Sequence, residues 1–191
     1  MVLASLKLLC TEAAPPVIED YGVEAPAGPV SQEGWACPLN LPLVEADSEP
    51  ARLSNAFTQE MSQMRSWYDL ALQGRGHTTV GASGVPVEEL ADFICTLLGG
   101  SVPAVEDPVA PPGRLVNLVA DDIRALYAEA LTAQPGQSVV SAEQLGNWFY
   151  LETAAGAALY GLRRLGDTSP DASVAEIAGS VAFPARLAGR S

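Results

Sequence analysis

The fold is decided by residues 48–74, which read SEPARLSNAFTQEMSQMRSWYDLALQG. Apolar side chains recur in this stretch at steps of three and four residues, the spacing that places them on one face of an α-helix. Ser48 is suited to cap the helix, Pro50 fits its first turn, and Gly74 is suited to end it. The stretch therefore predicts an amphipathic helix whose buried face carries Leu53, Phe57, Met61, Met64, Tyr68 and Leu72.

The same period returns in the second half of the chain. Helices are expected over residues 86–98, 114–133, 141–165 and 169–181. The helix at 141 begins with a capping box, in which the side chains of Ser141 and Gln144 each bind the other residue's free N–H. The sequence thus predicts an all-α fold, a compact bundle or array of four to five helices.

The first 47 residues depart from this pattern. Six prolines within residues 11–47 disfavour helix and central strand, because proline lacks an N–H and fixes φ. Large apolar side chains such as Ile18 and Trp35 are nevertheless present. We therefore expect an extended Pro-rich N-terminal arm over residues 1–47, packed on a helical domain of residues 48–188 or on a partner subunit.

Charge excludes two classes of partner. The 191 residues hold 10 Lys and Arg against 23 Asp and Glu, which gives a formal net charge of −13. Contacts to phosphate groups need basic side chains, so neither nucleic acid nor a membrane surface is expected as a partner. No apolar run approaches the length of a transmembrane helix.

Cysteine and histidine usage narrows the chemistry further. Cys10, Cys37 and Cys95 are widely spaced, which predicts no disulfide framework and fits a reducing, cytoplasmic compartment. Cys95 is expected to be a small core residue. His77 is the one histidine of the sequence, so centres built on several histidines are excluded. We expect neither a metal nor a cofactor.

A glycine-rich loop between the first two predicted helices is the first candidate site. Residues 74–84, GRGHTTVGASG, combine four glycines with polar side chains ahead of a helix N-terminus, an arrangement suited to binding an anion. The alternative is that the glycines only form tight turns and that a serine caps the next helix. The ligand-binding candidates in the loop are Arg75, His77, Thr78, Thr79 and Ser83.

The helix predicted at 141–165 supplies the second candidate site. Glu152 falls within its apolar arc, where an ionised carboxylate is costly and its pKa can rise toward that of an acid or base. Alternatively, Glu152 reaches the edge of the face or binds a backbone N–H. Trp148 precedes a run of small residues, 154–158. An aromatic side chain beside small residues suggests either a pocket for a small molecule or close helix packing.

Acidic residues also gather in the stretch 121–129, DDIRALYAE. We interpret Asp121, Asp122 and Glu129 as a solvated acidic face with Arg124 as a local partner.

Two functions fit these observations. The first is a cytoplasmic all-helical interaction protein (a subunit, adaptor or maturation chaperone) that binds a segment of a protein partner in a groove between helices, or pairs with itself as a homodimer. The second is a small helical enzyme or ligand-binding protein whose site lies between the 74–84 loop and the 141–165 helix. In that site His77 and Glu152 act as acid and base, and Arg75 binds an anion. The shortage of catalytic groups favours the first.

Overall fold

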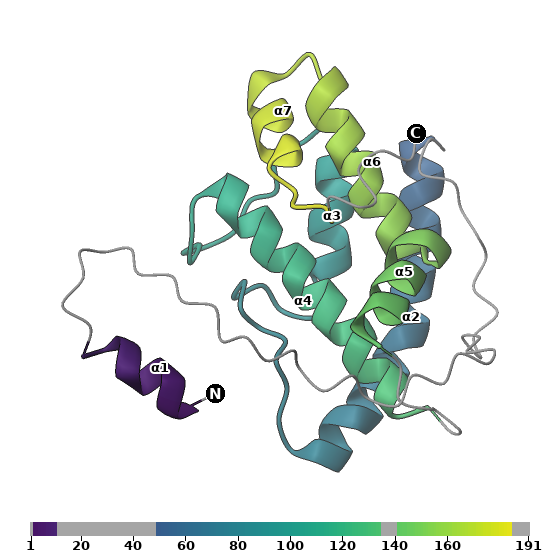
Figure 1. Cartoon of the computed structure of the whole chain (residues 1–191). Helices are drawn as coiled ribbons and strands as arrows, with labels where there is room; N and C mark the ends of the chain where they lie inside the picture. Colours follow the sequence, from purple (N-terminus) through teal and green to yellow (C-terminus); the bar gives the residue numbers. More distant parts are fainter. Residues whose placement is uncertain (1, 11–48, 135–140, 185–191) are drawn as a thin grey trace. The chain divides into compact units, whose positions relative to one another are not determined.

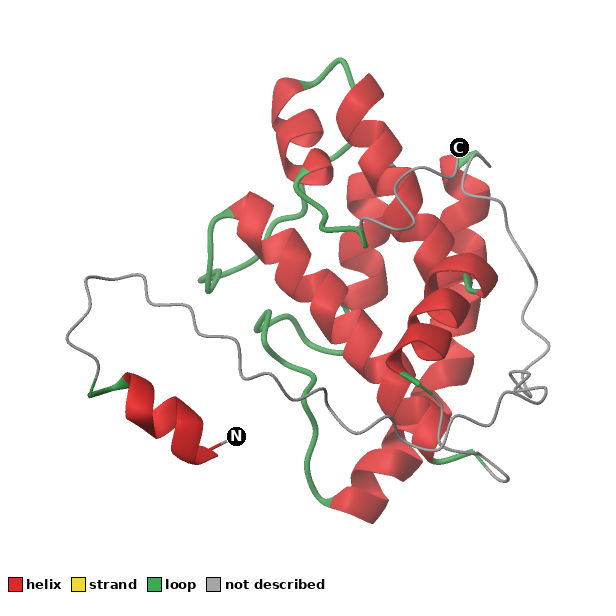
Figure 2. Cartoon of the chain, in the orientation of Figure 1, coloured by secondary structure: helices red, strands yellow, loops and turns green. Residues whose placement is uncertain are grey.

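The computed structural model describes residues 2–10, 49–134 and 141–184. The chain divides into two compact units, Met1–Val30 and Ser31–Ser191. The described residues form seven helices and no strand, which confirms the all-α prediction (Figures 1 and 2). Helices are more numerous than expected, because Val2–Leu8 forms a helix, α1, and because one predicted helix is two. Residues 11–48 lie outside the described residues, so the extended arm stays a prediction.

Helix α2 spans Pro50–Arg75 and starts with proline in its first turn, as predicted. The predicted cap, Ser48, lies outside the described residues, and Glu49 takes the N-cap position without a side-chain hydrogen bond. The predicted end at Gly74 is wrong. The helix ends at Gly76, whose left-handed φ of 72° suits a residue without a side chain and whose N–H donates to the Leu72 carbonyl at 2.8 Å.

Two further helices follow at the predicted places. Helix α3, Leu90–Leu98, begins later than expected because residues 86–89 form a turn closed by the Glu89 N–H and the Pro86 carbonyl at 2.9 Å. Helix α4 runs from Pro112 to Thr132. The apolar faces predicted for both are buried; they carry Leu90, Phe93, Ile94, Leu97 and Leu98 in α3 and Leu115, Val119, Ile123, Leu126 and Ala130 in α4.

The single helix predicted over 141–165 is wrong. Helix α5, Ala142–Glu152, begins with the predicted capping box of Ser141, but it stops before Thr153, and a new helix, α6, spans Ala154–Thr168. Thr153 is extended, with φ −121° and ψ 151°, and its hydroxyl accepts from the Gly156 N–H to cap α6. A Cβ at Gly156 would overlap the main chain at Phe149, so the tight joint requires glycine there.

The last helix, α7, spans Ala172–Gly179 and lies within the predicted range, and the Asp171 side chain caps it by accepting from the N–H groups of Ser173 and Val174. In the second unit, α2 packs chiefly on α4, while α6 packs on α2 and α7 (Figure 1). None of the described helices is long and apolar enough to cross a membrane. The largest fully buried side chains of this core are Trp148, Tyr127, Phe57, Leu53, Met64, Leu90, Ile94, Leu97, Ile123, Leu126, Leu159 and Leu162.

Candidate functional site

The loop after α2 binds a carboxylate of α4. The N–H groups of Gly81 and Ala82 donate to one oxygen of Asp122 over 2.8 and 2.9 Å. Ser83 donates to the other oxygen, through its N–H at 2.9 Å and through its hydroxyl at 2.5 Å. Asp122 is only 1% exposed, so its carboxylate has lost its hydrogen bonds to water. The hydrogen bonds from the loop take their place.

A second carboxylate of α4 holds the preceding residues of the loop. Glu129 accepts from the N–H and hydroxyl of Thr79 at 2.8 and 2.7 Å, and from the hydroxyl of Thr78 at 2.9 Å. Burial is the largest single influence and raises the pKa of Glu129. The hydrogen bonds from Thr79 and Thr78 and the charge of Arg75 together outweigh it, so the pKa is lowered. We call residues 78–83 the clamped loop.

The anions that this loop binds therefore come from the chain itself. The hydroxyls of Thr78, Thr79 and Ser83 already donate to carboxylates of α4. These contacts do not favour binding of an external ligand by the same hydroxyls, which stays a prediction. The solvated acidic face is wrong for Asp122 and Glu129. They lie seven residues apart, two turns along α4, and both face the loop.

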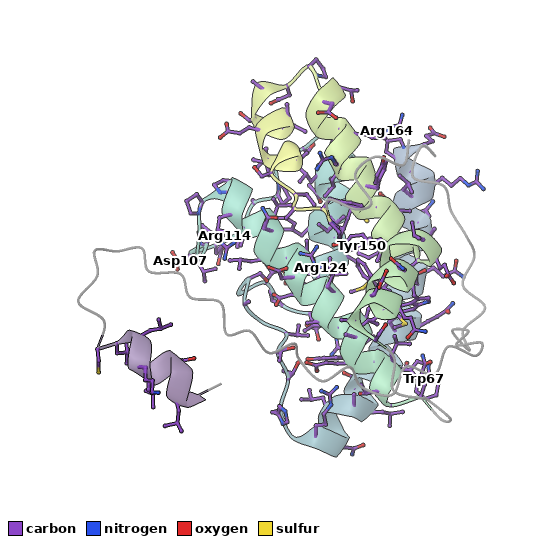
Figure 3. The ribbon with its side chains drawn as sticks, viewed as in Figure 1. Trp67, Asp107, Arg114, Arg124, Tyr150 and Arg164 are labelled. Atoms are coloured by element: carbon purple, nitrogen blue, oxygen red, sulfur yellow. The ribbon has the colours of Figure 1, made fainter. Side chains whose placement is uncertain are left out.

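Arg124 is confirmed as the partner of Asp121. Its guanidinium donates to the Asp121 carboxylate and to the Tyr150 hydroxyl of α5, and Figure 3 shows Arg124 and Tyr150 side by side. Burial, the largest influence, lowers the pKa of Arg124, but Tyr150 and Asp121 more than compensate and the pKa is raised. Arg124 is therefore a charged link between α4 and α5.

The proposed acid and base are not joined by any contact among the described residues. The His77 side chain is exposed and its Nδ1 lies 3.0 Å from the Arg75 carbonyl, while Arg75 donates to the Thr132 hydroxyl at 2.9 Å. Glu152 is exposed, which fits the alternative that its side chain reaches the edge of the apolar face. Helix α5 ends at this residue, so the side chain lies exposed at a helix terminus instead of within a continuous apolar face. Their catalytic roles stay predictions.

Trp148 lies in the core. It is 1% exposed, and its ring centroid is 6.1 Å from that of Tyr127. This position fits the packing alternative for the aromatic and small residues of the 141–165 stretch. Cys95 is half-buried, with its sulfur 3.8 Å from the Ser54 carbonyl, and packs against the core as expected of a small core residue.

A buried carboxylate that the sequence reasoning missed lies on α2. Glu60 is 1% exposed and accepts from the Tyr127 hydroxyl at 2.7 Å and from the N–H groups of Ala154 and Ala155 at 2.8 and 3.1 Å. Burial, the largest influence, raises its pKa against the effect of these bonds. The spacing of Glu60 along the chain could have predicted its burial, because it lies three residues after Phe57 on the apolar face. Glu60 caps the start of α6, which makes it structural.

An open cavity of about 560 Å³ lies between α3 and the stretch that connects α3 to α4. Among the apolar side chains that line it, Val85 and Phe93 are buried and Val105 is half-buried, while Pro86 and Ala104 are exposed. Three exposed carboxylates also line it, those of Glu89, Asp92 and Glu106. We call this cavity the acidic groove.

One wall of the acidic groove is a segment without regular structure, residues 102–110, which we call the strap; Asp107 marks it in Figure 3. The strap forms no hydrogen bond with any described residue. A smaller cavity of about 260 Å³ lies against the same segment and shares Phe93 and Val105 with the groove. It also touches Leu115 of α4 and Ile177 of α7.

Within the described ranges, no three His, Cys, Asp or Glu side chains gather in a way that could hold a metal ion. Comparison of the chain with protein-family models, curated proteins and solved structures found no match.

Proposed function

We propose that the protein is an interaction protein that binds a segment of a protein partner in the acidic groove. The observation that carries this proposal is a hollow with buried apolar side chains and exposed carboxylates in its lining. Its volume of about 560 Å³ falls within the range of roughly 300–1,000 Å³ found for ligand sites. As a subunit, adaptor or maturation chaperone it would act in the cytoplasm, where free thiols such as those of Cys10 and Cys95 persist.

The buried carboxylates outside the groove already have hydrogen-bond partners within the fold. Asp122 and Glu129 bind the clamped loop, and Glu60 binds α6, so these buried carboxylates have their partners inside the fold. The groove carboxylates differ from them. The side chains of Glu89 and Asp92 make no hydrogen bond or ion pair with the described residues, and they remain available to a second molecule.

The proposal is tested by selecting a displayed library of short peptides on the full chain and measuring the dissociation constants of the selected peptides by fluorescence anisotropy. Thr96 lines the groove and is exposed, so Thr96→Trp fills the hollow without removing a core side chain. Thr168→Trp places the same side chain at an exposed site on α6 and is the matched control.

Selected peptides should lose at least about tenfold in affinity with Thr96→Trp, a change of about 1.4 kcal/mol, and keep their affinity with Thr168→Trp. The proposal fails if no peptide is selected, or if the selected peptides bind both variants as they bind the wild type. Sedimentation of the unliganded chain shows whether a second copy is the partner. If the wild type forms a homodimer that Thr96→Trp dissociates, a second copy of the chain binds in the groove.

A further inference from the structure

We infer that the segment bound in the acidic groove is a basic one from another protein, with Lys or Arg residues flanking an apolar anchor. This inference rests on the proposed function and adds the chemistry of the partner. Charge is the first reason. Glu89, Asp92 and Glu106 line one hollow, and among the described residues none of the three side chains is paired with a cation. Bringing positive charge to them relieves their mutual repulsion.

The basic side chain near this end of α3 is already occupied. Arg65 of α2 lies 2.8 Å from Asp69 and 2.9 Å from Glu88, the residue before Glu89. The guanidinium hydrogen bond to Asp69 is the largest influence on Arg65 and helps to raise its pKa, so Arg65 stays charged in this pair. Arg65 is therefore not available to neutralise the carboxylates of the groove.

The apolar anchor follows from the lining of the groove. Phe93 is 7% exposed and Val85 is 6% exposed, and both border the hollow, so an aliphatic or aromatic side chain placed there would lose its water. Phe93 also borders the smaller cavity, which is lined mainly by apolar and proline residues, including Leu115 and Ile177. A long apolar side chain would therefore find apolar surface in both hollows.

The strap suggests that the segment binds in an extended form. Ala104, Val105 and Glu106 line the groove, and their main-chain N–H and C=O groups form no hydrogen bond with the described residues. Main-chain groups of this kind can pair with an extended peptide, as exposed strand edges do. A flanking Lys or Arg on such a peptide would reach the carboxylates of the lining.

The composition of the chain argues against its own long N-terminal segment as occupant. Residues 11–48 contain seven Asp and Glu and no Lys or Arg, so their charge would oppose that of the groove. The C-terminal residues carry Arg186 and Arg190 on either side of Leu187, and they are the internal competitor that the experiment has to exclude.

The test compares three fluorescent peptides of equal length, in which one leucine is flanked by lysines, by glutamates or by serines. Fluorescence anisotropy gives their dissociation constants for the full chain at low and high NaCl. We expect the lysine peptide to bind at least about tenfold more tightly than the other two, with an advantage that shrinks as salt screens the groove.

Charge-reversed variants locate the binding. Glu89→Lys/Asp92→Lys should lower the affinity for the lysine peptide by at least about tenfold. The control, Glu143→Lys/Asp167→Lys, changes the net charge by the same amount at exposed positions outside the groove lining and should leave the affinity nearly unchanged. Circular dichroism melting confirms that both variants are folded.

The outcomes separate the two proposals. If peptides selected from the library respond to Thr96→Trp but lysine, glutamate and serine peptides bind alike, the groove binds a partner and the inference of a basic segment is overturned. If equal losses occur in both charge-reversed variants, the attraction is not local to the groove, and the inference is likewise overturned. If Arg186→Glu/Arg190→Glu raises the affinity for the lysine peptide tenfold or more, the chain's own terminus fills the groove, which overturns the inference of a separate partner.

Discussion

At the scale of single residues, Asp122 carries the strongest local prediction. It receives hydrogen bonds from Gly81, Ala82 and Ser83, and both Asp122 and Ser83 are buried, where a donor left unpaired is costly. Asp122→Ala should therefore lower the free energy of unfolding by about 3 kcal/mol. Urea unfolding measures this loss, and hydrogen exchange should show faster exchange of the loop amides.

The neighbouring residue provides the control for Asp122. Asp121 is 55% exposed in its side chain and pairs with Arg124 on the surface, an interaction worth about 0–1 kcal/mol. Asp121→Ala removes the same carboxylate one position away and should leave the loop amides protected. Equal losses in the two variants would show that the carboxylate of Asp122 does not hold the loop.

Glu129 gives the clamped loop a dependence on pH. Its folded-state pKa lies below the ordinary value of 4.5, despite burial, because of the hydrogen bonds from Thr79 and Thr78 and the charge of Arg75. The lowered pKa means that the stability this residue contributes is fully present above pH 4.5 and is lost as pH falls through the folded-state pKa.

The difference in unfolding free energy between wild type and Glu129→Gln should therefore be constant near neutral pH. It should shrink below pH 4.5, the ordinary value for this carboxyl group. Urea titrations from neutral to acidic pH measure it. A difference that grows on acidification would contradict the lowered pKa.

The sequence offers anion binding as one of two interpretations of the loop, and it does not show which anion would be bound. Glycines and hydroxyls next to a helix start are a local signal, so they can be read from residues 74–84 alone. The partner, Asp122, lies 39 residues from Ser83 along the chain. The seven-residue spacing of Asp122 and Glu129 shows a shared face on α4, but only the packing of loop on helix decides whether that face meets water or donors.

At the scale of elements, the joint between α5 and α6 depends on Gly156. A Cβ there would overlap the main chain of Phe149 and Tyr150, and backbone cannot move aside as a flexible side chain can. Gly156→Ala should lower the free energy of unfolding by at least about 2 kcal/mol, although alanine is the better helix former. Chemical denaturation followed by circular dichroism measures the change.

Gly74 supplies the opposite expectation for the same substitution. It lies exposed within α2, and a Cβ there would meet nothing within 4 Å. Gly74→Ala should raise the free energy of unfolding by about 0.5–1 kcal/mol, because it reduces the entropy that the helix loses on folding. Stabilisation in both variants would mean that α5 and α6 do not meet tightly at the joint.

Periodicity predicted the buried faces of α3 and α4 correctly, because those faces are encoded by neighbours three and four residues apart. Periodicity also predicted one helix where the structure has α5 and α6, since apolar and small residues continue on both sides of Thr153 with helical spacing. What divides them includes Glu60 of α2, which binds the N–H of Ala154 from 94 residues away. A partner at that separation leaves no local pattern, and neither does the acidic groove, whose walls come from α3 and from an irregular connector.

At the scale of the whole molecule, the balance of charge dominates. The chain carries 23 acidic against 10 basic residues. Three ion pairs join described side chains, and all involve exposed carboxylates, so each contributes at most about 1 kcal/mol. We therefore expect repulsion among the remaining carboxylates to outweigh these attractions and to destabilise the folded chain at low ionic strength.

Sodium chloride should accordingly stabilise the protein. Raising its concentration from about 0.01 M to 1 M shortens the screening length from about 30 Å to 3 Å and weakens the repulsion. Since 1 kcal/mol corresponds to roughly 2–4 °C for a chain of this size, Tm should rise by several degrees in calorimetry.

The Glu143→Lys/Asp167→Lys variant separates screening from the general effect of salt on apolar surface. Its net charge is less negative, so its Tm should rise less than that of the wild type. An equal rise in both proteins would assign the stabilisation to apolar burial, and a fall in Tm would show that the ion pairs prevail.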